Sequence, residues 1–440
     1  MYLPRLRNLF PLLFCLFSVV IYAQQEDTYS KEIHIADSVV FSIERQVDSI
    51  MNMGIAKEAF PGAQLKVWHR GQEIFHKTYG YHTYDSIRPV ETEAIYDLAS
   101  VTKIAGPLLG LMKLYEEGKL DLDAPFSDYW RSWKNKADKQ DITLRELLAH
   151  QSGLDPYIAF LNTVVRKDRL KTRFLKSKPS KRFSKRAYDK IYVKNRFNRK
   201  MFRNIKRLKV NSEKTYVYSG IASLLYPELI KQLSGQSYEQ YLIQNFYEPL
   251  GCETLGFNPL EKDLGPIVPT EIDTVFRKSL VQGWVHDENA ALLGGISGNA
   301  GLFGTADDLA ILMQMLLQKG VYKGRRYLKE STVDEFIRVQ YPENDNRRGL
   351  GFDKPLIGND TLTINASYPA PVVSQKSFGH SGFTGTFVWA DPEFELVFIF
   401  LSNRVYPDRS HRNLYNLNIR PSLQRVFYKT LFDDSDFINN

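Results

Sequence analysis

Strand-like and helix-like patterns of apolar residues are distributed unevenly along the chain. Four short apolar runs predict strands, and they lie in two pairs near the two chain ends: 63–69, 72–79, 385–390 and 395–401. A short polar turn joins the members of each pair. Helical spacing of apolar residues precedes the first pair and follows the second, and mostly helical patterns fill the middle of the chain.

This distribution predicts an α+β fold. An antiparallel sheet would be built from both chain ends and flanked by helices, with a mostly helical subdomain formed by the middle of the chain. A chain of 440 residues exceeds what one hydrophobic core usually holds, which favours two subdomains. The sequence contains no internal repeat.

The segment Ser100-Val101-Thr102-Lys103 can place a nucleophile beside its base. Residues three apart on a helix are neighbours, and a serine hydroxyl needs a nearby base before it can attack a carbonyl. Taken alone, the pair is more typical of a solvated Ser and Lys on a surface helix. Pro107 should bend this helix just beyond Lys103, and Gly118 should end it.

Two further segments give that pair a context. They are Tyr216-Val217-Tyr218-Ser219-Gly220 and Phe378-Gly379-His380-Ser381-Gly382-Phe383-Thr384-Gly385. Together with S-x-x-K they resemble the Y-x-N and K-T-G or H-T-G motifs of the serine beta-lactamase and penicillin-binding protein superfamily. The likeness is strongest to the class C beta-lactamase-like branch, which also contains D-alanyl-D-alanine carboxypeptidases and esterases. It covers about residues 36–432, with one insertion.

The resemblance implies roles for these residues. Ser100 would be the acylated nucleophile and Lys103 its proton acceptor, while Tyr218 would share the proton network and help to activate the deacylating water. The backbone N–H groups of Ser100 and Phe383 would form the oxyanion hole. Substrate-binding residues would come from the third motif: His380, Ser381, Gly382 and Phe383.

Two departures from the family pattern bear on the substrate. Gly220 stands where penicillin-recognising members carry Asn, so no side chain is available to bind a substrate amide. His380 stands where many members carry Lys, and a neutral imidazole is a weaker anchor for a carboxylate. Both changes argue against an efficient beta-lactamase and leave a cell-wall peptidase, an esterase or an amidase.

The charge of the chain is concentrated in residues 166–210. From Arg166 to Lys209 there are 20 basic residues and two acidic ones, a net charge of +18, whereas the remainder carries 38 basic and 48 acidic residues, a net charge of −10. Such an insertion can bind an anionic cell-envelope polymer or a membrane surface. The alternative is a solvated helical excursion whose aromatic residues pack against the enzyme. Nucleic acid is not an expected partner of an exported protein.

The N-terminus has the pattern of a signal peptide. Arg5 and Arg7 precede an apolar stretch from Leu9 to Ala23, which is short for a membrane span. Cleavage near Ala23 would remove residues 1–23 and leave 24–440 as a periplasmic or secreted domain; an uncleaved membrane anchor is the alternative. Only Cys252 would remain, so no internal disulfide could form.

No metal or cofactor is expected. His286-Asp287-Glu288 lacks the spacing of a metal site and is interpreted as a substrate contact near the mouth of the active site. His150 is interpreted as part of a structural turn. The sequence therefore predicts an exported serine hydrolase that acts through an acyl-serine intermediate on an ester, an amide or a cell-wall peptide. The alternative is a non-catalytic protein that binds anionic envelope polymer through its insertion.

Overall fold

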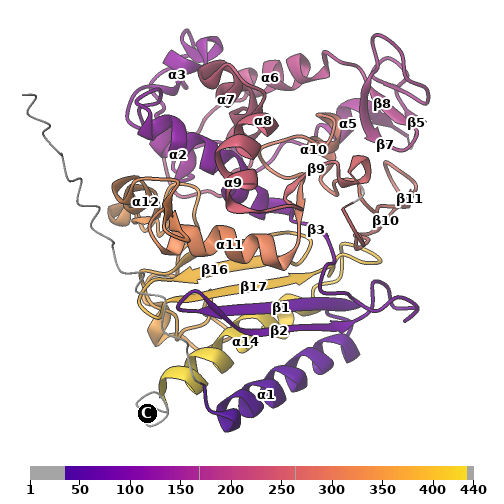
Figure 1. Cartoon of the computed structure of the whole chain (residues 1–440). Helices are drawn as coiled ribbons and strands as arrows, with labels where there is room; N and C mark the ends of the chain where they lie inside the picture. The colour runs from indigo at the N-terminus through magenta and orange to yellow at the C-terminus, as the bar shows by residue number, and fades with distance from the viewer. Residues whose placement is uncertain (1–34, 168, 263, 434–440) are drawn as a thin grey trace, which may run out of the picture. The chain divides into compact units, whose positions relative to one another are not determined.

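A five-stranded antiparallel sheet joins the two ends of the chain. The computed structural model describes residues 35–167, 169–262 and 264–433, so the predicted signal peptide lies outside the described residues. The strand order is β15-β16-β17-β1-β2 (Figure 1). The strands are β1 (Gly62–His69), β2 (Gln72–Gly80), β15 (Phe378–Ser381), β16 (Phe387–Asp391) and β17 (Leu396–Ser402). The predicted α+β fold is confirmed.

Pairing of β1 with β17 closes the sheet, with Ala63 opposite Ser402. All four runs of the apolar pattern form strands. The fifth strand, β15, begins the third motif, and its mixed sequence Phe378-Gly379-His380-Ser381 gave no apolar signal of its own.

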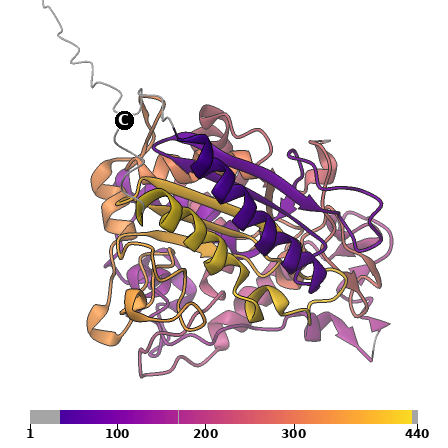
Figure 2. The ribbon, with the colours of Figure 1, turned by 90° about the horizontal axis from the view of Figure 1, so that it is seen from below.

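Helices cover both faces of the sheet. α1 (Asp37–Ala56) and α14 (Ile419–Tyr428) pack together on one face, and α11 (Ala306–Leu317) packs on the other (Figures 1 and 2). In β17, Phe398 and Phe400 join the core beneath α1 and α14, whereas Val397 and Ile399 join the core on the α11 side. Because both faces are buried, the strand is a continuous apolar run.

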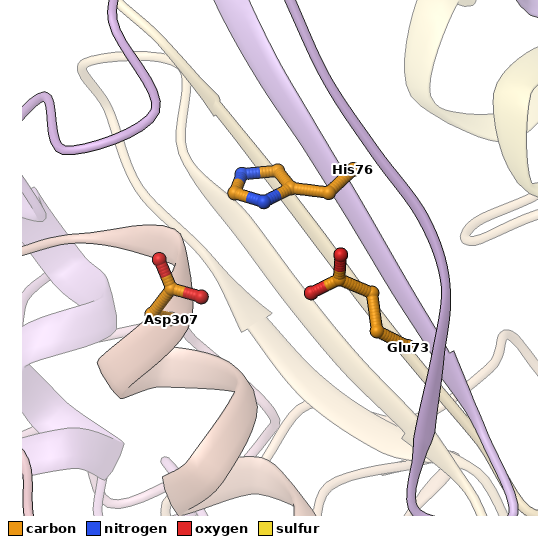
Figure 3. Close-up of side chains that lie close together, drawn as sticks. All are labelled: Glu73, His76 and Asp307. Carbon is orange, nitrogen blue, oxygen red and sulfur yellow. The ribbon is translucent and has the colours of Figure 1, made fainter.

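Lys66 of β1 is buried on the α11 side of the sheet and is held by ionic partners. Its ammonium pairs with Glu73 of β2 and with Asp307 in the first turn of α11, and His76 Nδ1 lies 3.2 Å away. Figure 3 shows the three partner side chains converging. Since a buried charge is costly unless it is paired, the cluster explains how a lysine occupies the interior of the sheet.

The helix that follows Ser100 is the centre of the mostly helical part. It begins with a 3₁₀ turn (Ala99–Val101), continues as a π-helical turn (Ile104–Leu108) that contains Pro107, and becomes α2 (Leu109–Glu116). The wider π turn accommodates the proline. Gly118, at φ +69°, follows the end of the helix as predicted.

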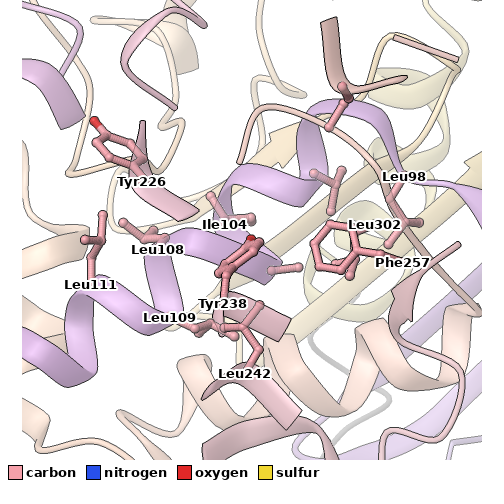
Figure 4. Close-up of a cluster of buried hydrophobic side chains, with 14 of the residues drawn as sticks. Leu98, Ile104, Leu108, Leu109, Leu111, Tyr226, Tyr238, Leu242, Phe257 and Leu302 are labelled. Atoms are coloured by element: carbon pink, nitrogen blue, oxygen red, sulfur yellow. The ribbon is translucent and has the colours of Figure 1, made fainter. Parts of the chain in front are cut away.

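Apolar side chains from several segments surround that helix. Figure 4 shows Ile104, Leu108 and Leu109 among side chains of α7 (Tyr226–Ser234) and α8 (Tyr238–Leu242). Gly106 permits this approach, since an added Cβ would lie 2.5 Å from the hydroxyl oxygen of Tyr238.

Short elements complete the described part of the chain. They are α3 (Phe126–Tyr129), α4 (Leu144–Leu148), α5 (Leu161–Val164), α9 (Glu248–Leu250), α10 (Glu288–Leu292), α12 (Glu330–Ile337), α13 (Asn413–Asn416), β3 (Tyr96–Asp97), β9 (Gly256–Phe257), β10 (Ile272–Asp273), β11 (Ser279–Leu280), β12 (Leu302–Gly304), β13 (Val321–Tyr322) and β14 (Arg325–Arg326). None of the helices in the described residues combines the length and the apolar character needed to cross a bilayer.

The basic insertion is folded, and only its last part is helical. It contains β4 (Val165–Arg166), β5 (Arg169–Leu170), β6 (Leu175–Lys176), β7 (Lys185–Tyr188), β8 (Ile191–Val193) and α6 (Phe197–Arg207). The expectation of a helical excursion is therefore wrong for residues 166–193. Phe197, Met201 and Ile205 are buried in the main core, and the Tyr188 hydroxyl donates to the carbonyl of Leu280 at 2.8 Å. The insertion is thus packed into the fold.

Candidate active site

Ser100 and Lys103 lie in direct contact at the start of the central helix. Lys103 Nζ is 2.9 Å from Ser100 Oγ and also donates to the carbonyl oxygen of Asn299 at 3.0 Å. The side chain of Asn299 is itself fixed by hydrogen bonds to Ser297 and Asp287. The buried Lys103 side chain is therefore held by two oxygen atoms. The Ser100 hydroxyl is the one that the sequence predicted, and the Asn299 carbonyl is one that it did not.

A strained turn presents the serine. Ala99 has φ +45°, a conformation that a non-glycine residue adopts only when its surroundings hold it. The carboxylate of Asp97 accepts hydrogen bonds from the amides of Ala99 at 2.9 Å and His286 at 2.6 Å. Burial raises the pKa of Asp97. Asp97 thus fastens the nucleophile turn to the 286–288 segment.

The third motif docks on the same turn. The hydroxyls of Thr384 and Thr386 donate to the carbonyl oxygens of Asp97 and Leu98 at 2.7 and 3.0 Å. Gly382 permits this contact because a Cβ there would lie 2.6 Å from the Leu98 carbonyl oxygen. These bonds bring Phe383, the second predicted oxyanion donor, to the cleft that Ser100 lines.

Tyr218 lies beside the serine and lysine with its ring in a polar cluster. The ring centroid is 5.5 Å from Lys103 Nζ, 5.6 Å from Arg348 Cζ and 4.6 Å from the ring centroid of His150. Tyr218 remains 36% exposed, so its ring is supported from within the protein and open to the cleft. The three catalytic residues predicted from the sequence are therefore brought together.

Both histidines beside Tyr218 are neutral. His380 Nδ1 donates to the carbonyl of Ser381 at 2.7 Å, which leaves Nε2 as a buried acceptor with no hydrogen-bond partner among the described residues. Burial, then the charges of Arg348 and Lys103, lower the pKa of His380 to about 3. His150 Nδ1 accepts from the amide of Ser219, and burial lowers its pKa well below the usual value.

A buried ion-pair network supports the cleft behind Tyr218. Arg348 is 1% exposed; its Nη1 lies 3.1 Å from Asp353 Oδ1, and its Nη2 donates to the Gly351 carbonyl at 2.9 Å. Arg347 pairs with the same carboxylate at 2.8 Å. Burial alone would raise the pKa of Asp353, but Arg348 and Arg347 hold it below its ordinary value. No sequence motif marked this network.

These groups line one cleft of about 360 Å3. Its lining residues are Ser100, Tyr216, Tyr218, Arg347, Arg348, Asp353, Tyr368, His380, Ser381, Gly382, Phe383 and Tyr415. Every residue predicted from the three motifs lines the cleft except Lys103, which contacts the Ser100 hydroxyl. His286, Asp287 and Glu288, which were interpreted as a substrate contact, do not line it.

The 286–288 segment lies at this cleft through Phe383. The ring of His286 stacks on Phe383 at 5.6 Å, and His286 Nε2 lies 2.8 Å from Glu271 Oε2. Asp287 accepts from Asn299. The segment therefore supports two residues of the site, whereas a substrate contact stays a prediction.

Comparison with known proteins places this geometry in a family. The family model described as Beta-lactamase matches residues 44–419. The chain belongs to the beta-lactamase family. An N-acetylmuramyl-L-alanine amidase of Bacillus subtilis strain 168 is 30% identical over 84% of this chain and 83% of its own length. A protein of Escherichia coli K12 named "Putative D-alanyl-D-alanine carboxypeptidase" is 29% identical over 83% of each chain.

A solved structure shares the fold at lower identity. EstCE1, described as a hydrolase with promiscuous acyltransferase activity, superposes with a TM-score of 0.63 at 18% sequence identity. The match covers 88% of this chain and 99% of EstCE1. Family membership and the hydrolase relatives identify the chain as a serine hydrolase related to beta-lactamases and penicillin-binding proteins.

Proposed function

We propose that this serine hydrolase works through an acyl intermediate on Ser100. The observation that carries the proposal is the 2.9 Å contact between Lys103 Nζ and Ser100 Oγ at a cleft. Lys103 Nζ accepts the hydroxyl proton as Oγ bonds to the substrate carbonyl carbon. The proton then passes to the leaving nitrogen or oxygen as its bond to that carbon breaks.

Deacylation uses water and Tyr218. Water adds to the acyl carbon while the proton network of Tyr218 and Lys103 accepts its proton, and Ser100 Oγ leaves with a proton returned to it. The amides of Ser100 and Phe383 stabilise the oxyanion in both steps.

We propose an amide or peptide of the cell wall as the substrate. The relatives named as a muramyl-alanine amidase and a carboxypeptidase support this class, and both match more than four fifths of the chain. Gly220 has open space around it, and His380 is neutral, so the cleft lacks two groups with which family members bind penicillins. An esterase is the second candidate, because a neutral acceptor at His380 suits a small ester as well.

Adduct formation and a substrate panel test these assignments. A serine-reactive phosphonate should add its mass to the wild-type protein and leave Ser100→Ala unlabelled in intact mass spectrometry. Equal labelling of both proteins contradicts the nucleophile assignment, and no labelling of the wild type favours the non-catalytic alternative. N-acetylmuramyl-L-alanine and a peptide ending in D-Ala-D-Ala should be cleaved, and p-nitrophenyl esters should turn over faster than nitrocefin.

We further propose that the protein is exported after removal of residues 1–23 and that its insertion binds anionic envelope polymer. The N-terminal charge and apolar pattern supports export, and the net charge of +18 between Arg166 and Lys209 supports polymer binding. N-terminal sequencing of the protein from its native host tests the first. A mature chain that retains Arg5 and Arg7 contradicts cleavage.

A further inference from the structure

A second hollow, separate from the catalytic cleft, is lined partly by the basic insertion. It has a volume of about 640 Å3 and is lined by Tyr129, Trp130, Arg131, Ser132, Arg199, Phe202, Arg203, Lys206 and Gln232. These residues come from α3 and the turn after it, from α6 and from α7, which lie near one another in Figure 1. The hollow shares no lining residue with the catalytic cleft. We call it the arginine groove.

The cations of the arginine groove have no acidic counterpart. Arg199, Arg203 and Lys206 are three or four residues apart on α6 and share one face of the helix. Arg131, in the turn after α3, lines the same groove. None of these four side chains makes an ion pair or hydrogen bond with any described residue, and no acidic residue lines the groove. Four unpaired like charges favour an anion between them.

Aromatic and neutral polar groups form the rest of the lining. Trp130 is 7% exposed and packs edge-on against Phe202, with the two ring centroids 5.4 Å apart. These two aromatic side chains pack on each other within the lining. Ser132 and Gln232 supply a hydroxyl and an amide. The lining therefore combines partners for acidic groups and for sugar hydroxyls.

We propose that the arginine groove binds an acidic glycan, a carbohydrate chain that carries carboxylate or phosphate groups. This inference rests on the proposed binding of anionic polymer by the insertion and narrows it to one groove. Arginine guanidinium groups match carboxylate and phosphate with paired hydrogen bonds, and a hollow of this size accommodates a few sugar rings.

The exposed side chains of the insertion favour a glycan over a membrane as the ligand. A peripheral protein that inserts into lipid needs large apolar side chains that protrude from its surface. In the described residues of the insertion, only Leu170, at 37%, is an exposed large apolar side chain. Single-stranded nucleic acid needs open aromatic faces for base stacking, whereas Trp130 is mostly covered.

Two triple variants of the full chain test the groove with matched charge. R199Q/R203Q/K206Q removes three cations of the groove, and K176Q/K178Q/K181Q removes three exposed cations of the same insertion that lie outside it. Binding to polygalacturonate, dextran phosphate and neutral dextran is measured at low and physiological salt. Circular dichroism and hydrolysis of a p-nitrophenyl ester show that each variant is folded.

The groove variant should lose about tenfold or more in affinity for an acidic dextran or polygalacturonate, and the control variant about twofold at most. Neutral dextran should not bind to the wild type or to either variant. The affinity of the wild type for the acidic polymers should fall as the salt concentration rises. The two acidic polymers distinguish a carboxylate ligand from a phosphate ligand. Equal losses in both variants overturn the groove and leave polymer binding by the insertion intact, while no binding by the wild type overturns both. Tighter binding to phosphatidylglycerol vesicles or to oligo-dT than to either acidic glycan overturns the choice of ligand.

Discussion

Arginines serve two different purposes in the catalytic cleft and in the arginine groove. In the cleft, Arg347 and Arg348 share the carboxylate of Asp353, and Arg348 is almost fully buried. In the groove, Arg199 and Arg203 lie at the surface and have no ionic partner among the described residues. A buried arginine that is paired with a carboxylate holds its neighbours in place, and its charge is already neutralised. An unpaired arginine at the surface keeps its charge available to a ligand.

Removing the nucleophile should abolish the activity of the cleft and leave ligand binding by the arginine groove unchanged. Ser100→Ala should lower kcat for any hydrolysed substrate by about a thousandfold or more, because the covalent route is lost. Its affinity for an acidic glycan should equal that of the wild type, since the groove and the cleft share no residue. Kinetics on the best substrate of the panel, with binding measured on the same preparation, checks both. A Ser100→Ala protein that retains most of its activity contradicts the assignment.

Breaking an ion pair in each region tests the difference in burial. Asp353→Asn leaves two arginines without their carboxylate, and removing one partner of a buried pair costs about 3–5 kcal/mol of unfolding free energy. Asp189→Asn breaks the exposed pair with Arg186 in the insertion and should cost about 0–1 kcal/mol. Urea unfolding measures both. Similar losses would show that the Asp353 network is no more desolvated than the surface.

Acid should weaken the protein partly through His380. The pKa of this histidine is about 3 in the folded protein, against 6.5 in an unfolded chain, because burial and the charges of Arg348 and Lys103 disfavour its proton. Between these values the unfolded chain binds a proton that the folded protein does not, so stability falls as pH drops from 6.5 toward 3.

The corresponding variant is His380→Gln. Between pH 6 and pH 4, the slope of its unfolding free energy against pH should be smaller than that of the wild type by up to about 1.4 kcal/mol per pH unit. Urea unfolding at a series of pH values measures both slopes. Identical slopes would mean that His380 carries a proton in the folded state.

The smallest effect is expected at Gly220, two residues after Tyr218. Gly220→Asn introduces the amide of the Y-x-N motif into space where a Cβ meets no atom within 4 Å, so the fold should tolerate it. One added hydrogen bond of about 0.5–1.5 kcal/mol should speed acylation by nitrocefin about two- to tenfold. Stopped-flow acylation rates measure the change. A slower variant would show that a side chain at position 220 does not bind the substrate amide.

The sequence predicted those parts of the fold and site that local patterns encode. The apolar runs at both ends became β1, β2, β16 and β17, and the spacing of Ser100 and Lys103 brought their side chains into contact. The strands β6, β7 and β8 of the insertion have two to four residues each, too few for a recognisable period among so many charges, and were expected to be helical.

The supporting residues of the site could not be predicted in the same way. Asn299 contacts Lys103 across 196 positions, and Asp97 accepts from His286 across 189. Arg348 and Asp353 lie close in sequence, but what matters is their burial beneath Tyr218, which is set by packing of distant segments. Such roles depend on tertiary contacts and leave no local pattern.

The pairing of β1 with β17 also means that the central sheet can form only late in synthesis. During synthesis, the β1–β2 hairpin emerges more than 300 residues before its partner, so one edge waits for nearly the whole chain. A nascent chain that ends between residues 218 and 378 contains Ser100, Lys103 and Tyr218 but lacks the third motif, which lines the same cleft. The proposed hydrolysis therefore depends on the last quarter of the chain, and until β17 arrives the hairpin exposes an unpaired edge that can pair with other chains.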